Sequence, residues 1–90
     1  MYTLTKFTTD GEVLTSTQEH EPTLKQLQGA VGGHIELLRT KEGDFFLNEE
    51  GKLIGLPYNE KATAFITQHV PLMPGDVIVG NALYVTPHME

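Results

Sequence analysis

The segment Val77-Ile78-Val79-Gly80-Asn81-Ala82-Leu83-Tyr84-Val85 decides the fold of this chain. Successive side chains of a strand point to opposite faces, and here apolar residues occupy both alternating sets. A strand that is apolar on both faces is typically central in a sheet and covered on both sides. Gly80-Asn81 interrupts the apolar pattern, which indicates a bulge or a close backbone approach. The sequence therefore predicts a strand at residues 77–85 that is either central in the sheet or covered on both sides.

Two segments with a helical spacing of apolar residues are expected to pack on that sheet. The first begins either after Thr23 as its N-cap or with Pro22 at its first position, and it ends at Gly32-Gly33, where glycine permits a left-handed C-cap. Gly29 lies inside this helix, where it lowers the helix propensity, and we interpret it as a site of tight packing on the sheet. The second helix follows the N-cap candidate Asn59 and ends before Pro71, which cannot continue a helix.

The remaining regular segments predict strands. Residues 2–9 and 12–18 alternate around Asp10-Gly11, a dipeptide typical of a two-residue hairpin loop. A meander of three strands separated by Gly-containing turns is expected at residues 34–40, 44–48 and 52–55. The predicted order is ββαβββαβ, a small single α+β domain over residues 1–90 with two helices against a mainly antiparallel sheet.

The predicted core consists of the apolar residues at the periodic positions of these elements. They are Leu24, Leu27, Val31, Ile35, Leu37, Phe45, Leu47, Phe65, Ile66, Val77, Val79 and Leu83. A chain of 90 residues buries only about 60% of the surface that its unfolded form exposes, so this core is thin. Because association adds buried area, we expect a homodimer or a larger symmetric homo-oligomer.

Composition excludes several classes of protein. The formal net charge is −6, and the six Lys and Arg residues are scattered rather than clustered, which disfavours nucleic-acid binding. Cysteine is absent, which excludes disulfides and thiolate metal sites and fits a reducing cytosol. No apolar run approaches the roughly 20 residues of a membrane span, and the first residues lack a signal-peptide pattern. We therefore expect a soluble, cytoplasmic protein with neither membrane nor nucleic acid as a partner.

Patterns for catalysis and for metal binding are weak. No cysteine nucleophile, Gly-x-Ser-x-Gly elbow or Gly-rich phosphate motif occurs, so we expect neither an enzyme nor a bound cofactor. His34 and Glu36 share a strand face and offer half of a metal site, whereas tight sites show three or four ligands. The alternative is that His34 is a surface or interface ring and that Glu36 pairs with Arg39 or Lys52. We expect no metal.

Four blocks of residues, taken in order, resemble a known family. They are Val31-Gly32-Gly33-His34-Ile35-Glu36, Leu47-Asn48-Glu49-Glu50-Gly51-Lys52-Leu53, Gly55-Leu56-Pro57-Tyr58-Asn59 with Ala62-Thr63, and Asp76-Val77-Ile78-Val79-Gly80-Asn81. They are similar to a family of small phage, prophage and plasmid proteins classed as a domain of unknown function, although that pattern often has Tyr in place of His34. The resemblance implies an accessory protein of a mobile genetic element in the bacterial cytoplasm, and it transfers no catalytic residue.

The same blocks contain the loops that we expect to form a site, because Gly, Asn and Pro are dense between residues 29 and 64. Free N–H groups at the start of the second helix would attract a small anion there. The alternatives are an ordinary solvated turn around Glu50-Gly51 and a plain N-cap loop before the helix. We predict that one pocket is lined by Glu36, Asn48, Glu49, Pro57, Asn59 and Thr63.

Two functions are compatible with such a pocket. The first is a non-enzymatic binding protein of a phage or mobile element that sequesters a small nucleotide-like signalling molecule of host defence, by analogy with phage sponge proteins. A phosphate pocket would then have to recruit Arg39, Lys41 or Lys52 from an acidic chain. The second is an acidic inhibitor or regulator that binds a host protein through its Gly-rich face.

Overall fold

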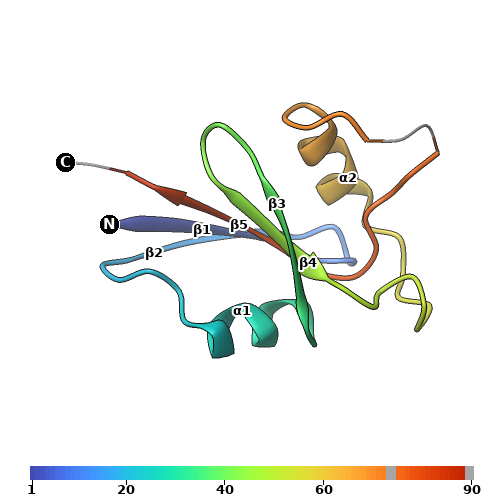
Figure 1. Ribbon diagram of the computed structural model, residues 1–90, viewed down its shortest axis with the longest axis horizontal. Coiled ribbons are helices and arrows are strands. Elements are labelled where there is room, and N and C mark those ends of the chain that lie inside the picture. Colours follow the sequence, from blue (N-terminus) through green and yellow to red (C-terminus); the bar gives the residue numbers. More distant parts are fainter. Residues whose placement is uncertain (73–74, 89–90) are drawn as a thin grey trace.

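Residues 1–72 and 75–88 of the chain are described in the computed structural model (Figure 1). They form an antiparallel sheet of five strands in the order β2-β1-β5-β4-β3. The α+β class, with a mainly antiparallel sheet and two helices, is therefore as predicted. The elements are β1 (Tyr2–Phe7), β2 (Val13–Gln18), α1 (Leu24–Val31), β3 (Ile35–Arg39), β4 (Asp44–Asn48), α2 (Glu60–Thr67) and β5 (Ala82–Pro87).

β5 is the central strand, as its apolar pattern predicted. It pairs with β1 on one side and with β4 on the other. Helix α1 covers one face of the sheet, and α2 lies over the opposite face (Figure 1). Tyr84 packs in the cluster under α2, whereas Leu83 and Val85 pack in the cluster under α1. The strand starts at Ala82, later than predicted, because Gly80 has φ +76°, which is outside strand geometry.

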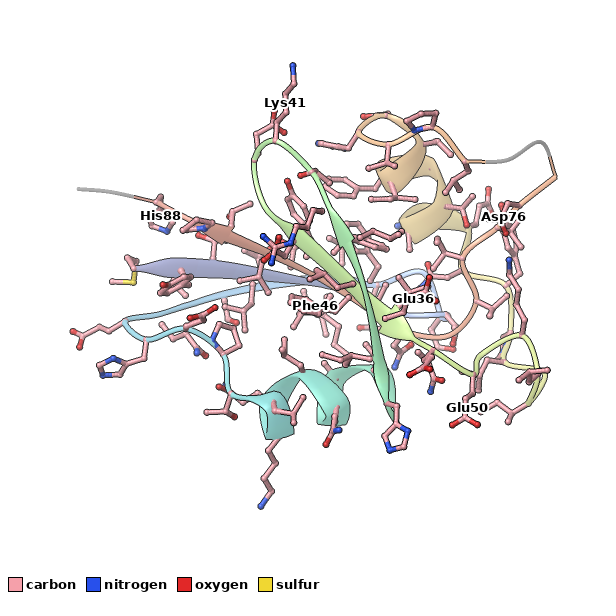
Figure 2. All side chains as sticks on the ribbon, viewed as in Figure 1. Glu36, Lys41, Phe46, Glu50, Asp76 and His88 are labelled. Carbon is pink, nitrogen blue, oxygen red and sulfur yellow. The ribbon has the colours of Figure 1, made fainter. Side chains whose placement is uncertain are left out.

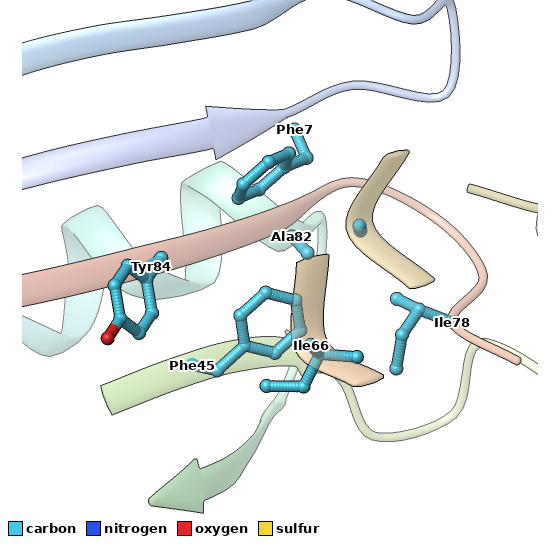
Figure 3. Packing of buried hydrophobic residues seen from close by; sticks show 7 residues of the cluster. Phe7, Phe45, Ile66, Ile78, Ala82 and Tyr84 are labelled. Atoms are coloured by element: carbon cyan, nitrogen blue, oxygen red, sulfur yellow. The ribbon is translucent and has the colours of Figure 1, made fainter. Parts of the chain in front are cut away.

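The sheet separates two apolar clusters. The cluster under α2, shown in Figure 3, comprises Phe7, Phe45, Ala62, Ile66, Ile78, Ala82 and Tyr84. The cluster under α1 comprises Leu4, Leu27, Val31, Phe46, Leu83 and Val85. The adjacent residues Phe45 and Phe46 thus point to opposite faces of β4, as their alternation predicted. The centre of the sheet is therefore buried on both faces.

The residues of the predicted core fall into three groups. Those buried as predicted are Leu27, Val31, Phe45, Ile66 and Leu83. Those half-buried are Ile35, Leu47, Phe65, Val77 and Val79. Leu24 and Leu37 are exposed, which contradicts the prediction. Leu24 is the first residue of α1 and Leu37 lies on the edge strand β3, so each has neighbours on fewer sides.

Helix α1 begins and ends as predicted. The Thr23 hydroxyl accepts a hydrogen bond from the Gln26 N–H (3.1 Å), and Gln26 Oε1 accepts one from the Thr23 N–H (3.0 Å), which is a capping box. Gly32 ends the helix at φ +79°, and its N–H donates to the Gln28 carbonyl (2.8 Å). The expectation of tight packing at Gly29 is wrong, because Gly29 is exposed and an added Cβ would meet no atom within 4 Å.

Replacing Gly29 with alanine is expected to raise the free energy of unfolding by about 0.5 to 1 kcal/mol, because alanine stabilises helices and loses no contact here. Urea denaturation followed by circular dichroism measures the change. The matched control is Gly32→Ala, which is expected to lower the stability because Gly32 has φ +79°. A lower urea midpoint for Gly29→Ala would contradict this account of α1.

The hairpin of β1 and β2 is formed, but its loop is one residue longer than predicted. The Thr8 N–H donates to the Glu12 carbonyl (2.9 Å), and the Gly11 N–H donates to the Thr8 carbonyl (3.1 Å). Residues 9–11 therefore connect the strands, with Gly11 at φ +89° in the left-handed position of a three-residue loop. The predicted two-residue loop is wrong. Asp10-Gly11 is also suited to the last two positions of this three-residue loop, so the dipeptide does not determine the loop length.

Residues 52–55, predicted as a strand of the meander, form successive turns instead. The Leu56 N–H donates back to the Gly51 carbonyl (2.9 Å), which closes these turns. Tyr58 then forms an isolated antiparallel bridge with Val79. The order of the described elements is thus ββαββαβ, with this bridge in the place of the additional predicted strand.

Candidate functional site

Asn59, one of the predicted site residues, lies in the interior with 1% of its surface exposed. As the N-cap of α2, its Oδ1 accepts a hydrogen bond from the Ala62 N–H (3.0 Å). Its Nδ2 donates to the carbonyl oxygens of Phe7 (2.9 Å) and Gly80 (2.8 Å). One side chain therefore ties the start of α2 to the end of β1 and to the segment before β5, which is a structural role.

Thr63 and Pro57 belong to the same framework. Thr63 Oγ1 donates to the carbonyl of the α2 N-cap (2.8 Å) and accepts from the Ile78 N–H (2.8 Å). The Pro57 carbonyl accepts from the Gly80 N–H (2.8 Å). A Cβ added to Gly80 would lie 2.7 Å from Leu56 Cδ1, so the Leu56 side chain packs closely against Gly80. These contacts hold the segment before α2 against the segment before β5.

Asn48 is a second buried amide, and it organises the end of β4. Its Nδ2 donates to the Val31 carbonyl at the end of α1 (3.2 Å), and its Oδ1 accepts from the Glu50 N–H (2.8 Å). The N–H of the intervening Glu49 donates to the His34 carbonyl (2.9 Å). The backbone of Glu49 is thereby held on both sides, while its side chain is exposed.

A groove is lined by β3 and β4, the turns that follow β4, and the segment before β5. Its polar residues are Glu36, Asn48, Glu49, Lys52 and Asp76. Figure 2 labels two of them, Glu36 on β3 and Asp76 before β5. We call this hollow the acidic groove. Its apolar lining consists of Leu38, Leu47, Leu53, Leu72, Val77, Ile78 and Val79.

The acidic groove contains the carboxylates of Glu36, Glu49 and Asp76 and one ammonium group, that of Lys52. Lys52 Nζ forms a hydrogen-bonded ion pair with Asp76 Oδ1, which also accepts from the Val77 N–H (3.0 Å). Across residues 1–72 and 75–88, Glu36 and Glu49 have no ion-pair partner within 4.0 Å. The alternative in which Glu36 pairs with a nearby cation is therefore not formed, and the groove presents two uncompensated carboxylates.

The Asp76 carboxylate is favoured in its charged form. The hydrogen bond from Lys52 lowers the pKa of Asp76, and partial burial opposes this effect. The charge of Lys52 and the hydrogen bond from the Val77 N–H lower that pKa further. Lys52 is thus committed to one carboxylate of the groove and is not a free cation for a ligand.

Replacing Lys52 with methionine is expected to return the pKa of Asp76 toward its ordinary value of 3.8, because the main cause of the lowering is removed. A lowered pKa means that the ion pair stabilises the fold above pH 3.8 and that this contribution disappears as the pH falls through the lowered value. An NMR titration of the Asp76 carboxyl carbon measures the pKa. Lys52→Arg, which keeps the cation, is the control, and the same pKa in both variants would contradict this assignment.

The structure brings three of the six predicted site residues together, since Glu36, Asn48 and Glu49 line the acidic groove. Pro57 lines a separate hollow with Gly80 and Asn81, and Asn48 borders both hollows. Asn59 and Thr63 line neither of these hollows and connect structural elements instead.

Sequence reasoning missed the apolar residues that stand beside the groove. Leu53 is 86% exposed and lines the groove, and the adjacent Ile54 is 60% exposed. Exposed apolar neighbours mark interaction sites more often than isolated apolar residues do. A signal was available in the sequence, because Leu53-Ile54 is an apolar pair flanked by Lys52 and Gly55, but the strand prediction assigned this pair to the sheet.

A metal site and a membrane-spanning helix have little support in the described part of the chain. Within residues 1–72 and 75–88, no group of three His, Asp or Glu side chains is placed to hold a metal ion. His34 Nδ1 lies 4.0 Å from Glu50 Oε1, and His69 Nε2 lies 3.4 Å from Glu42 Oε2. In the same ranges, no helix has the length and apolar character that a membrane span requires.

Comparison with known proteins places the chain in a family. The model of a domain of unknown function, DUF3846, matches residues 7–90. The chain belongs to this family. The match confirms that the ordered Gly-containing blocks belong to an uncharacterised domain family, and the phage or plasmid origin of this DUF3846 member stays a prediction. No curated protein and no solved structure matches the chain.

Proposed function

We propose that this protein is a non-enzymatic binding protein whose acidic groove takes a basic, partly apolar segment of a partner protein. The observation that carries the proposal is the pair of uncompensated carboxylates, Glu36 and Glu49, beside an apolar lining. A Lys or Arg side chain combines a cationic head with an aliphatic stem, so it matches both parts of the groove. Because the backbone of Glu49 is already held, binding orders less of the protein and loses less entropy.

The apolar turn beside the groove supports a macromolecular partner. Leu53 and Ile54 are mostly exposed and extend the apolar lining outward from the groove. Protein interfaces typically combine an apolar centre with a polar rim, and the charges on the rim steer the partner during association. The net charge of −6 extends the attraction for a basic partner beyond the groove itself.

The alternative ligand, a small nucleotide-like anion, has weaker support. Lys52 is the cation of the groove, and its ammonium group is engaged with Asp76. A phosphate group would meet Glu36 and Glu49 as like charges. The family resemblance implies the setting of either function, which is a phage or mobile element that acts on a host protein or against host defence in the bacterial cytoplasm.

Peptide binding to charge variants tests the proposal. The probe is a fluorescein-labelled peptide of about ten alternating Lys and Leu residues, and analogues with Glu for Lys or Ser for Leu separate charge from apolar contact. The double variant Glu36→Gln/Glu49→Gln is expected to weaken binding about tenfold, or about 1.4 kcal/mol, in fluorescence anisotropy. Its melting temperature should stay that of the wild type, because both side chains are exposed and outside ion pairs.

The matched control is Glu12→Gln/Glu19→Gln, which removes the same charge from exposed positions at the ends of β2. This variant is expected to bind the Lys-Leu peptide within about twofold of the wild type, because its charges are remote and screened. Equal weakening by the two double variants would contradict a role for the groove. A nucleotide retained in native mass spectrometry, together with no peptide binding, would favour the small-anion alternative.

A further inference from the structure

The two edges of the sheet differ in a way that points to a second interaction surface. β2 forms one edge, pairs with β1 alone, and has the sequence VLTSTQ, which carries no charge. β3 forms the other edge and carries Glu36 and Arg39. Charged side chains protect edge strands against pairing with other chains, so the edge at β3 is protected and the edge at β2 is not.

The exposure of β2 strengthens this contrast. Val13 is 47% exposed and Leu14 is 50% exposed, and residues 15–17 are exposed as well. The strand contains no Pro and pairs with β1 in continuous register from Val13 to Gln18, so no bulge within it turns the edge away. Its composition of Val, Leu and Thr suits a paired strand better than a solvated one.

We propose that β2 pairs with β2 of a second copy of this chain, antiparallel and centred on Thr15, so that the two sheets become one. A two-fold axis at this edge makes the interface self-complementary, because the same strand supplies both sides. The pairing covers the exposed apolar side chains at the start of β2. It also leaves the acidic groove free, since the groove is lined from β3 and β4 at the far side of the sheet.

The hydrogen-bond pattern of the hairpin determines which residues face the second copy. The Glu12 carbonyl accepts a hydrogen bond from the Thr8 N–H. In an antiparallel pair, every second residue of a strand directs its N–H and C=O groups to the same neighbouring strand. Leu14 and Ser16 therefore direct these groups toward β1, as Glu12 does. Val13, Thr15 and Thr17 therefore direct their N–H and C=O groups outward. A two-fold axis at Thr15 pairs Thr15 with its own copy and pairs each Val13 with a Thr17, so all of these outward groups are satisfied.

Charge supports the same register. With the axis at Thr15, Glu12 stands opposite Gln18 of the second copy, and Glu19 lies beyond the paired strand. An axis between Thr15 and Ser16 would place Glu12 opposite Glu19, and like charges directly opposite destabilise a strand pair. The net charge of −6 on each copy still opposes association at long range. Dimerisation is therefore expected to strengthen with salt, whereas binding of a basic peptide in the groove weakens.

Disulfide trapping tests the register, since the chain contains no cysteine of its own. With the axis at Thr15, Leu14 lies opposite Ser16 of the second copy in a non-hydrogen-bonded pair, with Cα atoms about 4.5 Å apart, within disulfide reach. An oxidised mixture of Leu14→Cys and Ser16→Cys chains is expected to yield mainly the mixed disulfide. Each variant alone is expected to crosslink at least about fivefold less, because its two thiols then sit on diagonal positions about 7 Å apart.

Sedimentation completes the test. Wild-type protein at 100 μM is expected to sediment at twice the chain mass of 10.0 kDa. Thr15→Pro removes an outward N–H without breaking a bond to β1, so it is expected to be folded and monomeric, and Thr15→Ala is the control that remains dimeric. A wild-type monomer, crosslinking dominated by Ser16→Cys alone, or a dimer that survives Thr15→Pro would each overturn the proposal.

Discussion

Replacement of Phe45 with alanine is expected to lower the free energy of unfolding by about 3 to 5 kcal/mol. Phe45 is 0% exposed, and its ring centroid lies 6.3 Å from that of Phe7, 6.2 Å from Phe65 and 6.4 Å from Tyr84. The residue lies on β4, next to the central strand, so the surrounding sheet has little freedom to close the cavity. Since the total free energy of unfolding of a small domain is about 5 to 15 kcal/mol, the variant would lose a large share of its stability.

Urea denaturation at 25 °C, followed by circular dichroism, measures this loss. The control is Phe65→Ala, which removes the same group from a half-buried site packed against the same aromatic cluster. We expect the loss at Phe65 to be smaller, because less apolar surface is buried there. An equal or smaller loss at Phe45 would mean that Phe45 is not at the centre of this core.

Replacement of Asn59 with alanine is expected to lower the free energy of unfolding by about 3 kcal/mol, which combines a lost N-cap with the loss of a donor to each of two buried carbonyl groups. The affected carbonyls are those of Phe7 and Gly80, and the cap partner is the Ala62 N–H. This loss exceeds the value of about 1 kcal/mol that an N-cap alone contributes. The excess arises because the Asn59 amide connects three parts of the chain.

The same denaturation experiment on Thr23→Ala provides the comparison. Thr23 caps α1 with its hydroxyl on an exposed surface, so its loss should be about 1 kcal/mol. Asn59→Asp keeps the capping oxygen but places a buried carboxylate oxygen against the Phe7 and Gly80 carbonyl oxygens, so its loss should be at least as large as that of Asn59→Ala. If Asn59→Ala and Thr23→Ala lower the free energy of unfolding equally, then the hydrogen bonds from Asn59 to the two carbonyls contribute nothing to stability.

Alternation and caps were sufficient to predict most of the fold. Phe45 and Phe46 point to opposite faces because the strand period is two, and this relation holds wherever a strand packs on both sides. Thr23 and Asn59 located the starts of both helices because their side chains bond to N–H groups only two or three residues ahead. The strand faces and the helix starts could be predicted from the local sequence because they depend on interactions between residues close in sequence.

The errors in the fold have a common cause in contacts between distant residues. Leu53-Ile54 is as apolar as a short strand, yet residues 52–55 form turns. Gly51 is buried at the start of these turns, and a Cβ there would lie 2.9 Å from Val79 Cγ2, so the path of the segment depends on the chain before β5. Neither the pattern nor the propensity of residues 52–55 contains that information.

The candidate site was predictable in part. Glu36, Asn48 and Glu49 were found because polar residues at the ends of adjacent strands come together wherever those strands pair. The sequence pattern around a polar residue at the end of a loop is the same whether its side chain binds a ligand or stabilises the fold. Asn59 was assigned to the pocket for this reason. The difference lies in its bond to the Phe7 carbonyl, 52 positions away in sequence.

The position of β5 has a consequence for synthesis on the ribosome. The central strand is the last one of the described chain, so β2-β1 and β4-β3 remain separate two-stranded units until residues 82–87 have emerged. Isolated two-stranded units are at best marginally stable in water, so the nascent chain is expected to gain little stability before β5 is available. A polypeptide that stops short of residue 82 would expose both apolar clusters to chaperones and proteases. The yield of folded protein is thus expected to depend on completion of β5.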